Sequence, residues 1–142
     1  MKTRPGLALV LAMASACAFA QEPSAYLFFN RSTTALMDDT TAKALFDETV
    51  SPKLTKLYPP QNWGFVTQVQ GGITPDNACV VTASVLMLPR NRPHATELLL
   101  FKPEQTASTF AALPAGSAAQ CAELARNKLR EAHRAMLATL LP

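Results

Sequence analysis

Two histidines are the side chains best suited to acid–base chemistry in this chain. His94 stands in a proline-bounded loop over residues 89–95, whereas His133 stands near the edge of an apolar helical stripe. Functional residues concentrate in loops, so His94 is the more plausible general base. Arg90 and Arg92 share its loop and favour the neutral imidazole. No Gly-x-Ser-x-Gly motif supplies a nucleophile for either histidine.

The acidic pairs, Asp38-Asp39 and Asp47-Glu48, offer little for catalysis because adjacent residues on a helix do not face each other. The first pair suits the start of a helix and the second a solvated helix face. Gly71-Gly72 lies between strand patterns, not before a helix, where phosphate cradles form. No metal-ligand spacing joins the histidines to cysteines or acids. We therefore predict no catalytic residue, no metal and no cofactor.

Basic residues form the more informative pattern. Three arginines recur every four residues near the C-terminus, so they share one line of a helix. A second basic group lies in the proline-bounded loop. Both are candidate sites for an acidic protein partner or an anionic membrane face, and the alternative is a solvated face balanced by acids such as Glu123 and Glu131. The predicted binding residues are Arg90, Arg92, His94, Arg126, Arg130 and Arg134.

Residues 1–20 have the three parts of a secretory signal peptide: basic Lys2 and Arg4, an uncharged apolar run, and the small-x-small exit Ala18-Phe19-Ala20. The run is shorter than the about 20 apolar residues that span a bilayer. A lipoprotein, anchored through Cys17, is the alternative. We expect export to the periplasm or the extracellular space, with no transmembrane segment in the mature chain.

Removal of the signal changes the charge and the cysteine count. Of the 142 residues 122 remain, with eleven basic against ten acidic residues and a net charge of +1. This near-neutral charge argues against a nucleic-acid partner. Cys79 and Cys121 remain, and two cysteines in an oxidising compartment most simply form a disulfide, here worth about 4 kcal/mol. A free thiol or half of a metal site is the alternative.

The secondary-structure pattern begins clearly only at Asp39, and residues 21–38 stay uncertain. From Asp39 the apolar residues follow helical spacing, with Pro52 opening a second short helix. Strand patterns follow over residues 63–70, 78–88 and 96–102, separated by turn residues. Ser117 and Gln120 form a capping box for a long helix that reaches Leu141.

These elements predict an α+β fold: an N-terminal helix, a three-stranded antiparallel meander, a long C-terminal helix packed on the sheet, and one disulfide. We expect a single domain over residues 39–142, of a size that supports one core.

The sequence favours a small exported, non-enzymatic binding protein with a protein partner, such as an inhibitor, immunity or accessory factor. One alternative is a small-molecule-binding or hydrolytic protein with a pocket between sheet and helices that uses His94 or Asp47 beside Trp63. Another is a structural subunit of a cell-envelope complex, with Leu99 and Phe101 on an exposed strand.

Overall fold

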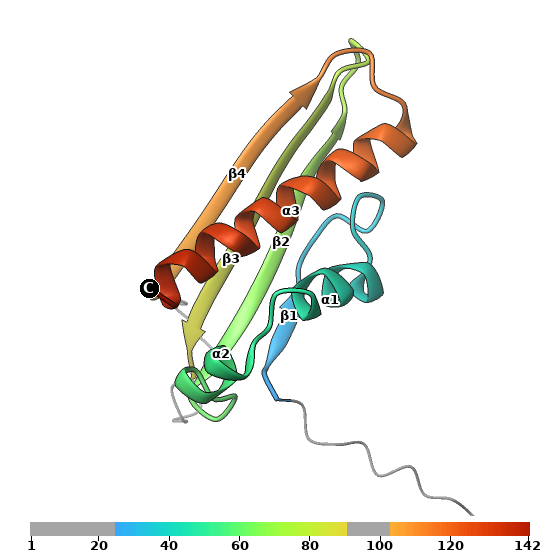
Figure 1. Cartoon of the computed structure of the whole chain (residues 1–142). Coiled ribbons are helices and arrows are strands. Elements are labelled where there is room, and N and C mark those ends of the chain that lie inside the picture. Colours follow the sequence, from blue (N-terminus) through green and yellow to red (C-terminus); the bar gives the residue numbers. More distant parts are fainter. Residues whose placement is uncertain (1–24, 91–102) are drawn as a thin grey trace, which may run out of the picture.

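A computed structural model describes residues 25–90 and 103–142 of the chain. One layer is a sheet and the other consists of helices packed on one of its faces (Figure 1). The α+β class is therefore confirmed. In chain order the elements are β1 (Phe28–Asn30), α1 (Asp39–Asp47), α2 (Pro52–Leu57), β2 (Trp63–Ile73), β3 (Cys79–Pro89), β4 (Gln105–Leu113) and α3 (Ala118–Leu140).

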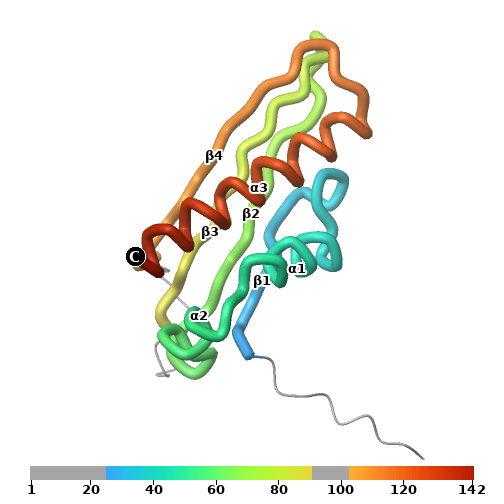
Figure 2. The backbone as a smooth tube through the Cα atoms, viewed as in Figure 1, coloured from blue at the N-terminus to red at the C-terminus, as the bar shows by residue number. Residues whose placement is uncertain are grey.

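The described strands form one sheet in the order β1-β2-β3-β4. β2, β3 and β4 are joined antiparallel, whereas β1 runs parallel to β2, with Phe28 opposite Phe65. The predicted three-stranded antiparallel sheet is therefore wrong, because the observed sheet has four described strands and is mixed. The tube in Figure 2 shows the three long strands side by side, with β1 beside one end of β2.

The beginning of the domain also differs from the prediction. The first described element is the strand β1, so the expected N-terminal helix is the second element, α1. Residues of the segment left uncertain by the sequence, Tyr26, Leu36 and Met37, are buried in the same core as the helices. The predicted strand over 96–102 lies outside the described residues, and the strand that pairs with β3 is β4.

Each helix begins at a side chain that satisfies a free backbone N–H group. Asp38 accepts a hydrogen bond from the Thr41 N–H and caps α1, and this bond lowers the pKa of the Asp38 carboxyl. Ser51 caps α2 in the same way, with Pro52 in its first turn. Ser117 and Gln120 form the complete capping box at the start of α3, as the sequence predicts.

The long C-terminal helix packs on the sheet, as predicted. Its buried stripe contains small residues, Ala125 and Ala132, together with Leu129. Ala83 on β3 is equally small and buried, and such residues allow a helix and a sheet to approach closely. α1 adds Phe46, whose ring contacts Tyr26, Phe28, Phe65 and His133. These contacts join α1, β1, β2 and α3 in one core.

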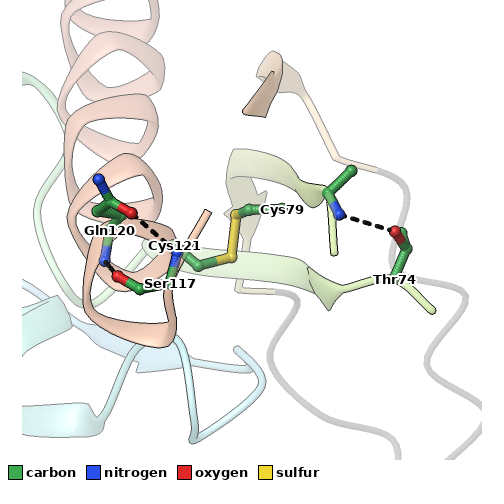
Figure 3. The surroundings of a disulfide bond; sticks show 6 residues. Thr74, Cys79, Ser117, Gln120 and Cys121 are labelled. Carbon is green, nitrogen blue, oxygen red and sulfur yellow. Dashed lines mark hydrogen bonds between the residues drawn. A yellow bond between two sulfur atoms is a disulfide. The ribbon is translucent and has the colours of Figure 1, made fainter. Parts of the chain in front are cut away.

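The predicted disulfide between Cys79 and Cys121 is present (Figure 3). It joins the first residue of β3 to the first turn of α3, beside the capping box. Both cysteines are buried. The bond closes a loop of 42 residues, which corresponds to about 4 kcal/mol in the chain-entropy description.

Candidate protein-binding surface

Two of the three arginines predicted on the C-terminal helix are ion-paired. Arg126 lies 2.6 Å from the Glu123 carboxylate, and its hydrogen bond lowers the pKa of that carboxyl. Arg130 lies 3.2 Å from Glu48, on the loop after α1, and also donates to Asn127. We call the line of Arg126, Arg130 and Arg134 on α3 the basic stripe. The Glu123 and Glu48 carboxylates neutralise part of its charge, so its attraction for an acidic partner is weaker than the sequence pattern indicates.

Of the remaining predicted binding residues, Arg134 continues the same line of α3, whereas the others belong to the segment after β3. Arg134 is exposed on α3 and forms no ion pair with a described residue. Arg90 follows β3 and donates to the Pro60 carbonyl at 2.6 Å, so it lies beside the segment before β2. Arg92 and His94 fall outside the described residues. Whether the six predicted residues share one surface therefore stays a prediction, since two of them are not among the described residues.

His133, one of the two histidines suited to acid–base chemistry, lies in the core of the protein. His133 is 1% exposed and lies edge-on to Phe46 at 5.3 Å between ring centres. Burial lowers its pKa to about 4, although the Leu45 carbonyl and the Glu48 carboxylate favour the protonated ring. No described group makes a well-formed hydrogen bond to either ring nitrogen. A buried neutral ring of this kind cannot reach a substrate in solvent.

Asp47 and Trp63, which with His94 are the residues expected to line the alternative pocket, contact other side chains. Asp47 is exposed and lies 2.7 Å from the Lys43 ammonium. Trp63 packs edge-on against Tyr58, with ring centres 5.8 Å apart. Within residues 25–90 and 103–142, no three His, Cys, Asp or Glu side chains gather as a metal site would require. These positions provide no catalytic set.

An open hollow of about 330 Å³ lies where β1 meets α1, lined by Phe28, Phe29, Asn30, Asp39 and Lys43. Its polar groups already bind one another. The Asn30 amide donates to the Asp39 carboxylate at 2.9 Å, and Lys43 donates to the Tyr26 hydroxyl and to Asp47. The hollow therefore offers a small ligand few unsatisfied polar groups to recognise it.

The sheet itself has the most unusual surface. None of the four described strands contains Asp, Glu, Lys or Arg. α1 and α3 cover one face, and the opposite face has no described helix over it (Figure 1). Alternate residues of β2, β3 and β4 point to this second face. Those that are exposed form what we call the uncharged patch: Gln70, Thr82, Thr106, Ser108, Phe110 and Ala112.

Phe110 is the most prominent member of the uncharged patch. Its side chain is 65% exposed, the largest exposed fraction of any large apolar residue described. It stands opposite Thr82 of β3, and the next row down contains Ser84 and Ser108, whose hydroxyls lie 2.9 Å apart. At the far end of the same face, by contrast, Val66 and Leu88 are buried. The patch is therefore a flat surface with hydroxyl, amide and aromatic groups but no charge.

This surface was not predicted from the sequence, because the strand over residues 105–113 was not predicted. Two signals were present. Exposed Thr106, Ser108 and Phe110 alternate with half-buried residues, at the period of a strand. In addition, no charged residue occurs between Glu104 and Glu123. Small residues such as alanine and serine have no marked strand preference, so the alternation is weak without the partner strand β3.

No helix in the described residues is both long enough and apolar enough to cross a membrane. Comparisons of the chain with protein-family models, with curated proteins and with solved structures give no significant match.

Proposed function

We propose that this chain is a small exported, non-enzymatic binding protein that acts through a protein–protein surface, as an inhibitor, an immunity factor or an accessory factor. The uncharged patch on β2, β3 and β4 is the observation that carries the proposal. It replaces the basic helix stripe as the favoured binding surface, because the patch lies free of any described element whereas Arg126 and Arg130 are already paired.

Along the strands of an antiparallel sheet, residues that point to the core alternate with residues that point to solvent. The residues on the solvent side are usually polar and often charged. Here every charged residue of the described chain lies on a helix or in a connection. Depletion of charge around an aromatic residue is the composition found at the centres of protein interfaces. Phe110 has the size and exposure of an anchor residue for such an interface.

Export is supported by two independent features. The first twenty residues have the composition of a signal peptide. The Cys79–Cys121 disulfide is the kind of bond that persists in oxidising compartments such as the periplasm and the cell exterior. Against the hydrolytic alternative, which uses His94 or Asp47 beside Trp63, stands the ion pair of Asp47 with Lys43.

The test is a capture experiment on cell-envelope extract with three forms of the chain. Thr82→Lys places a charge inside the uncharged patch, and Ala138→Lys adds the same charge on the exposed side of α3. We expect wild type and Ala138→Lys to retain the same protein, and Thr82→Lys to retain it at least about tenfold less well, because a charge desolvated without a partner is costly.

Two results would contradict the proposal. One is full retention by Thr82→Lys together with loss on charge reversal at Arg126 and Arg130, which would assign binding to the basic stripe. The other is failure of every form to capture a protein while the purified chain turns over a substrate in a manner that depends on His94.

A further inference from the structure

β4 is one border of the described sheet. In Figures 1 and 2 no other described strand lies beyond it, and its only described neighbour within the sheet is β3. A strand in this position presents a row of unpaired N–H and C=O groups to one side. Such an edge can accept another strand, with backbone hydrogen bonds providing affinity.

The hydrogen-bond pattern fixes which residues of β4 point outward. The Phe65 N–H donates to Leu27 and the Arg31 N–H to Thr67, so odd-numbered residues of β2 bond toward β1. Even-numbered residues of β2 therefore form their backbone hydrogen bonds with even-numbered residues of β3. This leaves the odd-numbered residues of β3 to bond β4, and the register pairs them with odd-numbered residues of β4. The backbone groups left on the outer edge belong to Thr106, Ser108, Phe110 and Ala112.

Within its own nine residues, β4 has none of the charges, prolines or bulges that normally protect an edge strand; the exposed Glu104 directly precedes it. Its nine residues contain no charge and no proline, and its register with β3 runs one to one from Leu113 to Gln105 without a bulge. The opposite described edge differs, because β1 has three residues and the charged Asp39 and Lys43 line the hollow beside it. Proteins usually blunt an edge with charges, prolines or bulges, so an unprotected edge of this length suits a partner strand.

We propose that the occupant of this edge is a second copy of the chain, paired antiparallel through β4 about a two-fold axis at Thr109. The inference rests on the proposed function, because it names one partner for the β4 residues of the uncharged patch. Centred on Thr109, Ser108 faces Phe110 of the second copy and Thr106 faces Ala112. Each of these pairs consists of outward-pointing residues, so every free N–H and C=O group of the edge is bonded.

The side chains agree with this register. Thr109 meets its own symmetry mate, and a Thr–Thr pair is favourable across antiparallel strands. The Thr109 hydroxyl already donates to the Lys128 carbonyl of α3, so this hydroxyl has a partner before the seam forms. On the other face the two Phe110 rings become diagonal neighbours, within reach of aromatic contact. The strands bring no like charges together, since β4 has none.

The experiment measures the mass of the full chain, expressed with its own N-terminus and with the disulfide intact, by sedimentation across a wide range of protein concentration. We expect a reversible dimer. Ser108→Pro removes one outward N–H group without breaking the ladder to β3 and should weaken the dimer at least about tenfold, because two-fold symmetry applies the change twice. Ser108→Ala, which keeps that N–H group, is the matched control and should dimerise like wild type.

Phe110→Lys is the second variant, in case the proline variant does not fold. It places charges on both sides of the axis and should also leave a monomer with an unchanged circular dichroism spectrum. Amide exchange gives the register: in wild type, protection of Thr106, Ser108, Phe110 and Ala112 should rise with protein concentration. Protection of Ala107 and Ala111, bonded to β3, should not change.

A chain that stays monomeric at the highest concentration, or a dimer unaffected by both variants, overturns the proposal. A monomer that still captures a protein partner through the uncharged patch would refute the second copy as partner and leave the proposed function intact. A chain that dimerises through β4 but captures no other protein would support the second copy as partner and refute the proposed capture of another protein.

Discussion

Acidification should destabilise this protein through His133. The ring is buried between α3 and α1 against Phe46, and no described group makes a well-formed hydrogen bond to its nitrogens. Its pKa falls from the ordinary value of 6.5 to about 4 because burial penalises the charged ring. Between these two pH values the unfolded chain binds a proton that the folded chain does not, so the free energy of unfolding decreases as the pH falls.

The size of the effect follows from the difference between the two pKa values. Each pKa unit corresponds to about 1.4 kcal/mol, so the free energy of unfolding should be about 3 kcal/mol lower at pH 4 than at pH 7 from this residue. The loss begins near pH 7 and is complete only below about pH 4, where both the unfolded and the folded chain are protonated. For a domain of this size, about 3 kcal/mol is a large fraction of the total stability.

The assay is urea denaturation of wild type and His133→Leu at several values between pH 7 and pH 4. Leucine fills a similar volume and does not titrate, so at pH 7 the variant should be as stable as wild type or about 1 kcal/mol more stable, since a polar group without partners is removed. Subtracting the two curves cancels all other titrating groups. If wild type and variant lose the same stability on acidification, His133 is not the cause and the reasoning is refuted.

Three further changes have defined outcomes by urea denaturation. Replacing Cys79 and Cys121 together with alanine should lower the free energy of unfolding by about 4 kcal/mol, and an unchanged value would exclude a structural role for the disulfide. Ser117→Ala removes the cap of α3 and should cost about 1 kcal/mol, with loss of helix ends visible in amide exchange. Gly71→Ala should cost about 2 kcal/mol or more, because φ is +127° and the new Cβ would meet a β3 carbonyl oxygen at 1.9 Å. Gly72→Ala is its control: φ is +148°, so backbone strain remains, but the new Cβ meets open space, and the cost should be clearly smaller.

The parts of the fold that could be predicted are those with strong local signals. The capping box at Ser117 and the regular apolar stripe that includes Leu129 identify α3 without tertiary information. The same stripe places Cys121 on the buried side, and its pairing with Cys79 follows once Cys17 is assigned to the signal peptide. The helix could be predicted because its signals come from residues close together in the sequence. The disulfide could be predicted because only two cysteines remain to pair.

The missed parts depend on partners distant in sequence. β1 consists of Phe28–Asn30, too short for any periodicity, and it becomes a strand through its parallel pairing with β2. β4 contains alanine, serine and threonine with Phe110 as its only large exposed residue, so β3 is needed to define it. Propensity in strands reflects packing on neighbours more than the backbone's own preference.

The candidate surface was harder to predict than the fold. Arginines at helical spacing are visible in a sequence, whereas their neutralisation by Glu48, from the end of α1, appears only in three dimensions. Conversely, the uncharged patch requires the register of three strands before Thr82 and Phe110 become neighbours.

The most direct test of binding through the sheet is a map of amide exchange on the chain, alone and in complex with the protein retained in the capture experiment. We expect new protection at Thr82, Ser108 and Phe110, and none along the arginine line of α3. Protection confined to Arg126, Arg130 and neighbouring residues, with the sheet unchanged, would contradict a binding role for the uncharged patch.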